Sequence, residues 1–189
     1  MNKESTKHRA VQEARSLVQS FGYSGFTFQQ VAENLQIRQP SLYQHFKSKE
    51  DLGGHLIEDY VNRFREWTEV IKVFDPKGKI NALFETFSSF SQDRRKICPL
   101  SSLISDYNSL PKPMQRALRK LFDVQYSWLN EVIQEGQRTK IFRKDKSSQE
   151  LAEQVLSMAF GSQLVARVLG AADKIRELKE RVFESLVIE

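Results

Sequence analysis

Apolar side chains recur at helical spacing along nearly the whole chain. The glycines and prolines fall mostly between these periodic runs, where helices begin or end. No run alternates between apolar and polar residues as a strand would, and no internal repeat is present. The pattern therefore predicts an all-α protein of about nine helices, at residues 3–21, 28–35, 40–46, 49–74, 78–92, 99–108, 114–138, 149–169 and 173–187.

The run from Phe28 to Lys47 fits two short helices joined by a tight turn. Thr27 is a good N-cap for the first helix, because its hydroxyl can accept a backbone N–H that has no partner in the helix. The positions expected to pack between the two helices are Val31, Ala32, Leu35, Ile37, Leu42 and Phe46. This spacing fits a helix-turn-helix, and it fits an ordinary helical hairpin within a bundle equally well.

The outward face of the second short helix carries side chains that can read DNA. Hydrogen-bonding groups suited to base edges in a major groove are Gln39, Ser41, Gln44 and His45. Lys47 and Lys49 follow, and no acid occurs from Asn34 to Lys49. Residues 107–122 are also free of acids and carry four basic residues, so charge alone does not identify a DNA-binding face. A solvated surface remains the alternative for this face.

Composition narrows the protein class. The chain has 189 residues, of which 40% are apolar, enough for one sizeable core or two small ones. The formal charge of +5 only weakly favours an anionic partner, and the single cysteine excludes an internal disulfide and suits a reducing compartment. No apolar run reaches the roughly eighteen residues that span a bilayer. These observations predict a soluble cytoplasmic protein without membrane contact.

Nothing in the chain resembles an active site. The three histidines, His8, His45 and His55, all lie in the first third of the sequence. His55 and Glu58 share a helix face, but two potential ligands do not make a metal site. There is also no glycine-rich loop of the kind that binds phosphates. We therefore expect no enzymatic activity, no cofactor and no metal.

The stretch TFQQVAENLQIRQPSLYQHFKSKEDL resembles the signature of the TetR family of bacterial transcriptional regulators. The resemblance implies a helix-turn-helix domain at residues 1–50 and an effector-binding and dimerisation domain at residues 51–189. It implies a DNA-contacting set of Thr27, Arg38, Gln39, Ser41, Tyr43, Gln44, His45, Lys47 and Lys49, with Thr27, Tyr43 and Lys49 at positions that commonly bind phosphates. Two residues depart from the family pattern: Gln36 replaces a turn glycine, and Arg38 replaces a small capping residue.

The resemblance also implies a homodimer. Two helix-turn-helix domains, here called reading heads, recognise a near-palindromic site better than one. Ser162, Ala166 and Gly170 form a stripe of small residues in one of the two last helices, and Leu178 and Val182 lie on the other. Small residues in such a stripe permit close approach of a second helix. We expect these five residues at the dimer interface, with packing inside one chain as the alternative.

In TetR proteins the middle helices usually enclose an effector pocket, so the resemblance points to the aromatic and polar residues there. The candidates for contact with a small-molecule effector are Trp67, Phe87, Tyr107, Gln125 and Trp128. Aromatic residues at helical spacing also form ordinary cores, and a neighbouring backbone group can satisfy Gln125. Both interpretations stay open.

Cys98 is a candidate sensor. It follows Arg94, Arg95 and Lys96 and precedes Pro99, and both cations and a helix start stabilise a thiolate. The segment CPLSSLISDY resembles the equivalent region of TetR members related to the N-ethylmaleimide-reductase repressor, which sense electrophiles through a cysteine. A lone cysteine is also commonly an inert apolar residue.

Together these features predict a repressor that binds double-stranded DNA as a homodimer and is released by a small-molecule or electrophile effector. The alternative is an architectural DNA-binding protein without an effector.

Overall fold

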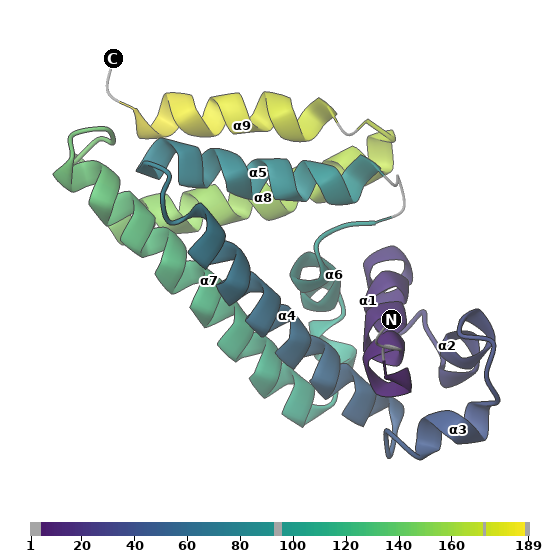
Figure 1. The fold of residues 1–189 in the computed structure, drawn as a ribbon. Coiled ribbons are helices and arrows are strands. Elements are labelled where there is room, and N and C mark those ends of the chain that lie inside the picture. Colours follow the sequence, from purple (N-terminus) through teal and green to yellow (C-terminus); the bar gives the residue numbers. More distant parts are fainter. Residues whose placement is uncertain (1–4, 93–95, 172, 188–189) are drawn as a thin grey trace. The chain divides into compact units, whose positions relative to one another are not determined.

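The computed structural model describes residues 5–92, 96–171 and 173–187, which form nine α-helices and one 3-10 turn (Figure 1). The elements in chain order are α1 Thr6–Phe21, α2 Phe28–Asn34, α3 Gln39–Tyr43, α4 Lys49–Ile71, α5 Pro76–Gln92, α6 Pro99–Ser105, η1 Tyr107–Ser109, α7 Lys112–Arg138, α8 Ser148–Leu169 and α9 Asp173–Leu186. Within the described residues no strand forms, and one isolated bridge joins Phe142 to Val187. The predicted all-α fold is confirmed.

The chain divides into two compact units. The first contains the described residues up to Arg63 together with Pro99–Leu121, and the second contains Phe64–Cys98 and the chain from Phe122 onward. Two of the three divisions fall inside α4 and α7, and the third lies between Cys98 and the start of α6. The functional boundary near residue 50 that the sequence suggested stays a prediction.

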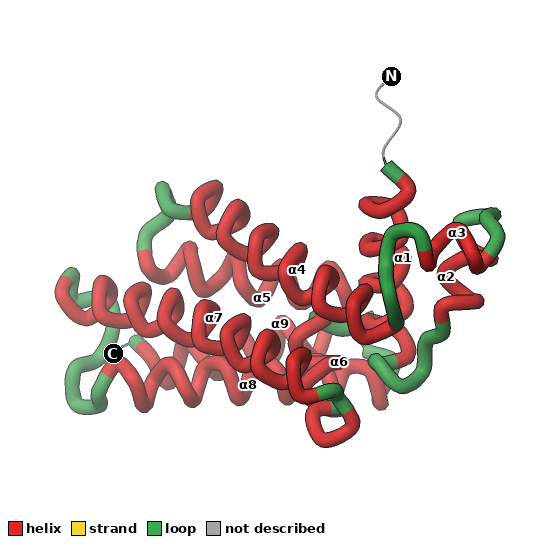
Figure 2. The backbone as a smooth tube through the Cα atoms, turned by 90° about the horizontal axis from the view of Figure 1, so that it is seen from below, coloured by secondary structure: helices red, strands yellow, loops and turns green. Residues whose placement is uncertain are grey.

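In the first unit, α2 and α3 form a helical hairpin beside α1, and α6 packs on α1 (Figures 1 and 2). The apolar positions predicted to pack within this hairpin are buried, apart from Ile37, which is half-buried in the turn. Leu42, the fourth residue of the five-residue α3, is fully buried. Since a helix this short is unstable alone, its packing on α2 holds it in place.

The start of α2 is fixed by a capping box. The Thr27 hydroxyl accepts the Gln30 N–H at 3.1 Å, and the Gln30 side-chain oxygen accepts the Thr27 N–H at 2.8 Å. Two backbone donors that the helix leaves without partners are thus satisfied. The N-cap predicted at Thr27 is confirmed.

The end of α2 is fixed by a Schellman motif, in which two backbone N–H groups bond back into the last turn. Ile37 donates to the Ala32 carbonyl at 3.0 Å, and Gln36 donates to the Glu33 carbonyl at 2.9 Å. Gln36 has a φ of 56°, the left-handed conformation that favours glycine. Gln36 therefore adopts the backbone conformation for which the family uses glycine, and the hairpin keeps its turn.

In the second unit, α5, α8 and α9 lie side by side (Figure 1). Lys179 on α9 donates to Asn81 at 2.8 Å and to Glu85 at 3.0 Å, both on α5. The buried side chains along these three helices include Ile80, Phe84, Phe87, Leu151, Val155, Ala159, Ile175 and Val182. This layer is the core of the second unit.

Some helix boundaries differ from the sequence prediction. We expected Lys112 and Pro113 to lie in a break, but α7 begins at Lys112. Proline is tolerated in a first turn because the N–H it lacks has no helical partner there. Helix α4 ends at Ile71 rather than near Phe74.

Candidate nucleic-acid interface

Helix α3 and the residues after it display polar side chains to solvent. Arg38, Tyr43, Gln44 and His45 are exposed, Tyr43 to 55%, whereas Gln39 and Ser41 are half-buried. The Tyr43 ring rests against Phe28 on α2, with ring centroids 5.1 Å apart. Arg38 lies at the N-cap position of α3, and its side chain makes no capping hydrogen bond. The predicted reading residues therefore share one short, firmly supported element.

The two lysines that follow α3 differ in their surroundings. Lys47 is exposed, and its backbone N–H donates to the Asp51 carboxylate at 2.8 Å. The Lys49 ammonium instead lies over the rings of Tyr23 and Phe26, 4.4 Å and 4.6 Å from their centroids. Burial lowers the pKa of Lys49, and the Asp106 carboxylate acts in the opposite direction. The Lys49 ammonium therefore lies over two aromatic rings in this structure, and its contact with a phosphate stays a prediction.

The predicted phosphate contact at Thr27 also has a structural role. Its hydroxyl takes part in the capping box and donates to the Gln30 side-chain oxygen at 3.2 Å. The residue is exposed, so phosphate contact and capping are compatible.

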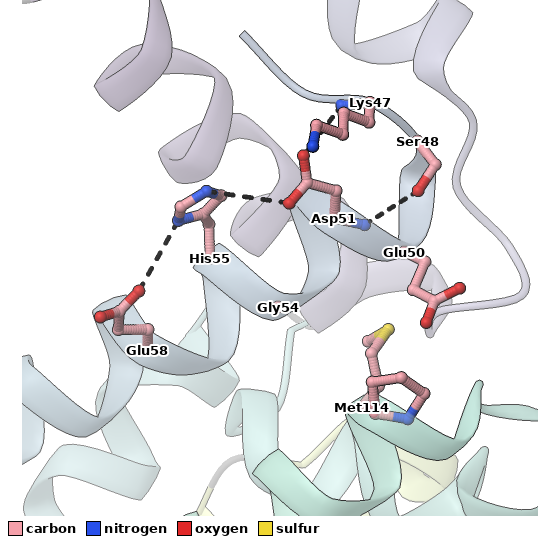
Figure 3. Close-up of a pocket in the computed structure, with 9 residues that line it drawn as sticks. Lys47, Ser48, Glu50, Asp51, Gly54, His55, Glu58 and Met114 are labelled. Atoms are coloured by element: carbon pink, nitrogen blue, oxygen red, sulfur yellow. Dashed lines mark hydrogen bonds and ion pairs between the residues drawn. The ribbon is translucent and has the colours of Figure 1, made fainter.

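A cavity of about 420 Å³ lies between the start of α4 and Met114 at the start of α7, within the first unit (Figure 3). The carboxylates of Glu50, Asp51 and Glu58 line it, and His55 lies 3.9 Å from Asp51 and 3.6 Å from Glu58. Lys47 lies at the edge of the same cavity, so a cation and several carboxylates meet there. Across the described ranges no cluster of three or more metal-binding side chains occurs, here or elsewhere.

The predicted effector residues do not all lie together. Trp67 and Trp128 are in contact, with centroids 5.3 Å apart, and Phe64 packs on both. Trp128 also borders a polar cavity of about 500 Å³. Phe87 is buried against Phe84 and Phe160.

Gln125 and Tyr107 are the two remaining candidates. Gln125 is only 3% exposed, and its buried side-chain oxygen has no hydrogen-bond partner. Tyr107 belongs to η1 in the first unit and is exposed. The structure therefore shows contact between Trp67 and Trp128, and the effector roles of all five residues stay predictions.

Cys98 is fully buried directly before α6. Its backbone N–H donates to the side-chain oxygen of Gln163 on α8 at 2.6 Å. Of the three cations on which its predicted reactivity rested, Arg94 and Arg95 lie outside the described residues. Gln163 was not predicted, because a bond across 65 residues leaves no local signal in the sequence.

The predicted dimer stripe faces largely inward. Ser162, Ala166 and Val182 are buried within their own chain and Leu178 is half-buried, while Gly170 is exposed at the end of α8. For the three buried residues the alternative of packing inside one chain applies. Small residues suit a close helix contact within a chain as well as between chains, so their spacing did not reveal which side they face.

The exposed apolar residues of α8 are different ones. Leu164, Val165 and Val168 are 43%, 46% and 85% exposed, and Leu169 is exposed as well. Residues 161, 164, 165 and 168 follow the spacing of a single helix face, so this outward stripe was visible in the sequence but was missed.

A capped α2, a Schellman turn and a short α3 with an exposed polar face together define a helix-turn-helix DNA-binding protein. A family model described as bacterial regulatory proteins of the tetR family matches residues 10–54. A second, described as a tetracyclin repressor-like C-terminal domain, matches residues 76–182. The chain belongs to the TetR family of bacterial transcriptional regulators, a family of regulators rather than enzymes.

Three relatives illustrate the similarity. The HTH-type transcriptional repressor DhaR of Mycobacterium sp. (strain GP1) is 22% identical over 173 residues, which cover 88% of this chain and 84% of DhaR. The crystal structure of a TetR transcriptional regulator from Legionella pneumophila is 28% identical, covers 98% of this chain and 100% of its own, and has a TM-score of 0.89. Reduced NemR of E. coli is 16% identical, covers 97% and 98%, and has a TM-score of 0.82, a likeness of fold.

None of the helices in the described ranges combines the length and the apolar character that a membrane span requires.

Proposed function

We propose that the protein is a repressor that binds a near-palindromic operator as a homodimer and is released by a small-molecule effector. The observation that carries DNA recognition is the α2–α3 hairpin, in which hydrogen bonds fix both ends of α2 while Tyr43, Gln44 and His45 stay exposed. A rigid hairpin can place these side chains in a major groove at little cost in conformational entropy. A bacterial regulator of this family meets its operator in the cytoplasm.

The outward apolar stripe of α8, defined as Gly161, Leu164, Val165 and Val168, supports the homodimer. Exposed apolar side chains in a row are unfavourable in water, and a second copy would cover them. Outside the adjacent residues and the backbone of its own helix turn, no atom lies within 4 Å of the position that a Cβ would take at Gly161, so this face of α8 is open to a partner helix. Two copies joined in this way carry two reading heads, which a palindromic site requires.

Gln125 supports a response to a small molecule. A buried amide oxygen without a partner costs free energy, and a ligand that donates a hydrogen bond would remove that cost. The effector of this proposal is therefore a compound with at least one hydroxyl or N–H group. Trp67 and Trp128 offer aromatic contact area in the same unit.

The operator can be identified by selecting genomic fragments that the purified protein retains. On the selected fragment we expect Gln44→Ala to weaken binding by about 1–3 kcal/mol and to leave random DNA unaffected, because a bidentate contact to a base is lost. Lys47→Ala should weaken both DNAs alike and lower the slope of log affinity against log salt. Equal losses on both DNAs for both variants would contradict the assigned roles of reading and anchoring.

Electrophile sensing through Cys98 remains part of the proposal. Because the Cys98 thiol is buried, it must be uncovered before an electrophile can react with it. We expect N-ethylmaleimide to modify the native protein slowly and the urea-unfolded protein at once, because the thiol must first be uncovered. Once attached, the added group overpacks the core and should reduce operator binding, whereas Cys98→Ser should bind normally after the same treatment. Mass spectrometry gives the extent of modification. Full operator binding by fully modified protein would leave Cys98 as ordinary packing.

An architectural DNA-binding protein is the alternative. It would stay on its operator in the presence of every small molecule tested. Release by a compound, with the same compound raising the melting temperature of the free protein, distinguishes the repressor from it.

A further inference from the structure

Helix α6 and η1 hold the end of α1 and the turn that follows it, all within the first unit. The Ser102 hydroxyl on α6 donates to the Val18 carbonyl at 2.6 Å, and this bond is buried. The Val18 carbonyl also accepts the Gly22 N–H at 2.9 Å. One helical turn beyond Ser102, the Asp106 carboxylate accepts the Ser24 N–H at 3.2 Å. Ser102 therefore contacts the last turn of α1, and Asp106 contacts the α1–α2 turn, defined as residues 22–26.

The fit between this turn and Asp106 is close. Gly22 has a φ of 76°, and a Cβ placed on it would lie 2.6 Å from the Asp106 carboxylate oxygen. The hydroxyl of Ser109 lies 3.3 Å from that of Ser24 and donates to the Asp106 carbonyl at 2.8 Å. Glycine at position 22 thus satisfies both the backbone conformation and the space that the carboxylate needs.

A cation completes the arrangement. Tyr23 and Phe26 belong to the α1–α2 turn, and the Lys49 ammonium lies over both rings. Asp106 is the negative charge that favours the protonated form of Lys49 against the effect of burial. The turn is therefore held by a carboxylate through its backbone and by an ammonium through its rings.

The turn leads directly into the reading head. It ends at Phe26, one residue before the N-cap Thr27, and the hairpin of α2 and α3 follows as one hydrogen-bonded unit. A change in the backbone of residues 22–26 would therefore rotate α3 together with α2. Small misplacements of a reading element cost base contacts, because hydrogen bonds depend steeply on direction.

We infer that Asp106 is a positioning residue for sequence recognition: by binding the Ser24 N–H beside Gly22, it fixes the α1–α2 turn and with it the orientation of α3. This inference rests on the proposed DNA-binding function. Asp106 touches no base itself, and it acts through the turn.

The test compares binding of the full-length protein to the genomically selected operator fragment and to a random duplex of equal length. In Asp106→Ala we expect operator affinity to fall about tenfold, a typical size for coupling between separate sites. Random DNA should be bound as well as before or slightly better, because a carboxylate is lost. Asp106→Asn, whose amide oxygen can still accept the Ser24 N–H, should restore most of the operator affinity.

Asp75 provides the matched control. Its carboxylate also accepts a backbone N–H, that of Gly78 at 2.7 Å, but in the turn before α5 of the second unit. Asp75→Ala should leave the ratio of operator to random affinity unchanged. Amide exchange should become faster at Ser24 in Asp106→Ala and stay at the wild-type rate in Asp75→Ala.

A folded Asp106→Ala protein with the wild-type ratio of affinities would overturn the inference. If that variant does not fold, Asp106→Ser, whose side chain is polar but shorter, replaces it in the test. We expect the same loss of operator affinity in this variant, and an unchanged ratio of affinities would again overturn the inference. Failure of the proposed function looks different, because the wild-type protein itself would then not distinguish any selected fragment from random DNA.

Discussion

Val168→Glu should convert the protein into a folded monomer that binds its operator at least on the order of 100-fold more weakly. Val168 is 85% exposed, so glutamate there disturbs no packing within the chain. In the proposed dimer the same carboxylate would enter an apolar seam, where an unpaired charge is strongly unfavourable. A monomer also loses the gain in affinity that a second, linked reading head provides.

Light scattering and operator titration check this expectation, with Val70→Glu as the matched control. Val70 lies on α4, is also apolar and is 73% exposed, so the two substitutions differ chiefly in their helix. The control should keep the wild-type mass and affinity. A Val168→Glu protein that remained dimeric would remove the outward stripe of α8 from the interface.

Gln125→Leu should stabilise the protein and abolish its response to the effector. The substitution replaces a buried oxygen without a partner by apolar atoms of similar volume, which we expect to raise the free energy of unfolding by about 1–3 kcal/mol. Operator affinity without effector should be unchanged. Urea denaturation measures the first effect, and release from operator by an effector measures the second.

Gln163→Leu is the informative counterpart, because we expect it to change the free energy of unfolding in the opposite direction. Gln163 is also fully buried, but its side-chain oxygen accepts the Cys98 N–H. Removing that acceptor leaves a buried donor unpaired, so the free energy of unfolding should fall by about 1–3 kcal/mol. A loss of stability in Gln125→Leu as well would mean that the Gln125 amide is structural, and the proposed ligand contact would be wrong.

The sequence predicted features that depend on neighbouring residues. The Thr27 cap, the buried positions Val31 and Leu42 and the turn at Gln36 all follow from spacings of a few residues, and the structure has each of them. The helical period likewise predicted every long helix to within a few residues.

Features that depend on distant partners were not predictable in this way. Ser162 and Ala166 are small enough for either side of α8, so their spacing did not reveal that they face inward. The sequence does not show that Tyr23 and Phe26 lie beneath the Lys49 ammonium, because residues more than 20 positions apart leave no local pattern. The bond from Ser24 to Asp106 joins residues 82 positions apart.

The left-handed residue at the end of α2 bears on how such hairpins are found in genomes. Glycine is the usual occupant of that conformation, yet Gln36 adopts it with a φ of 56° while both hydrogen bonds of the turn form. The steric penalty for a side chain there is only about 1–2 kcal/mol, which a well-packed hairpin tolerates. A sequence pattern that requires glycine at this position would not detect this chain, although its backbone forms the same left-handed turn that glycine usually forms. Patterns that weigh the buried positions on either side of the turn, and leave the turn residue free, would detect more of these reading heads.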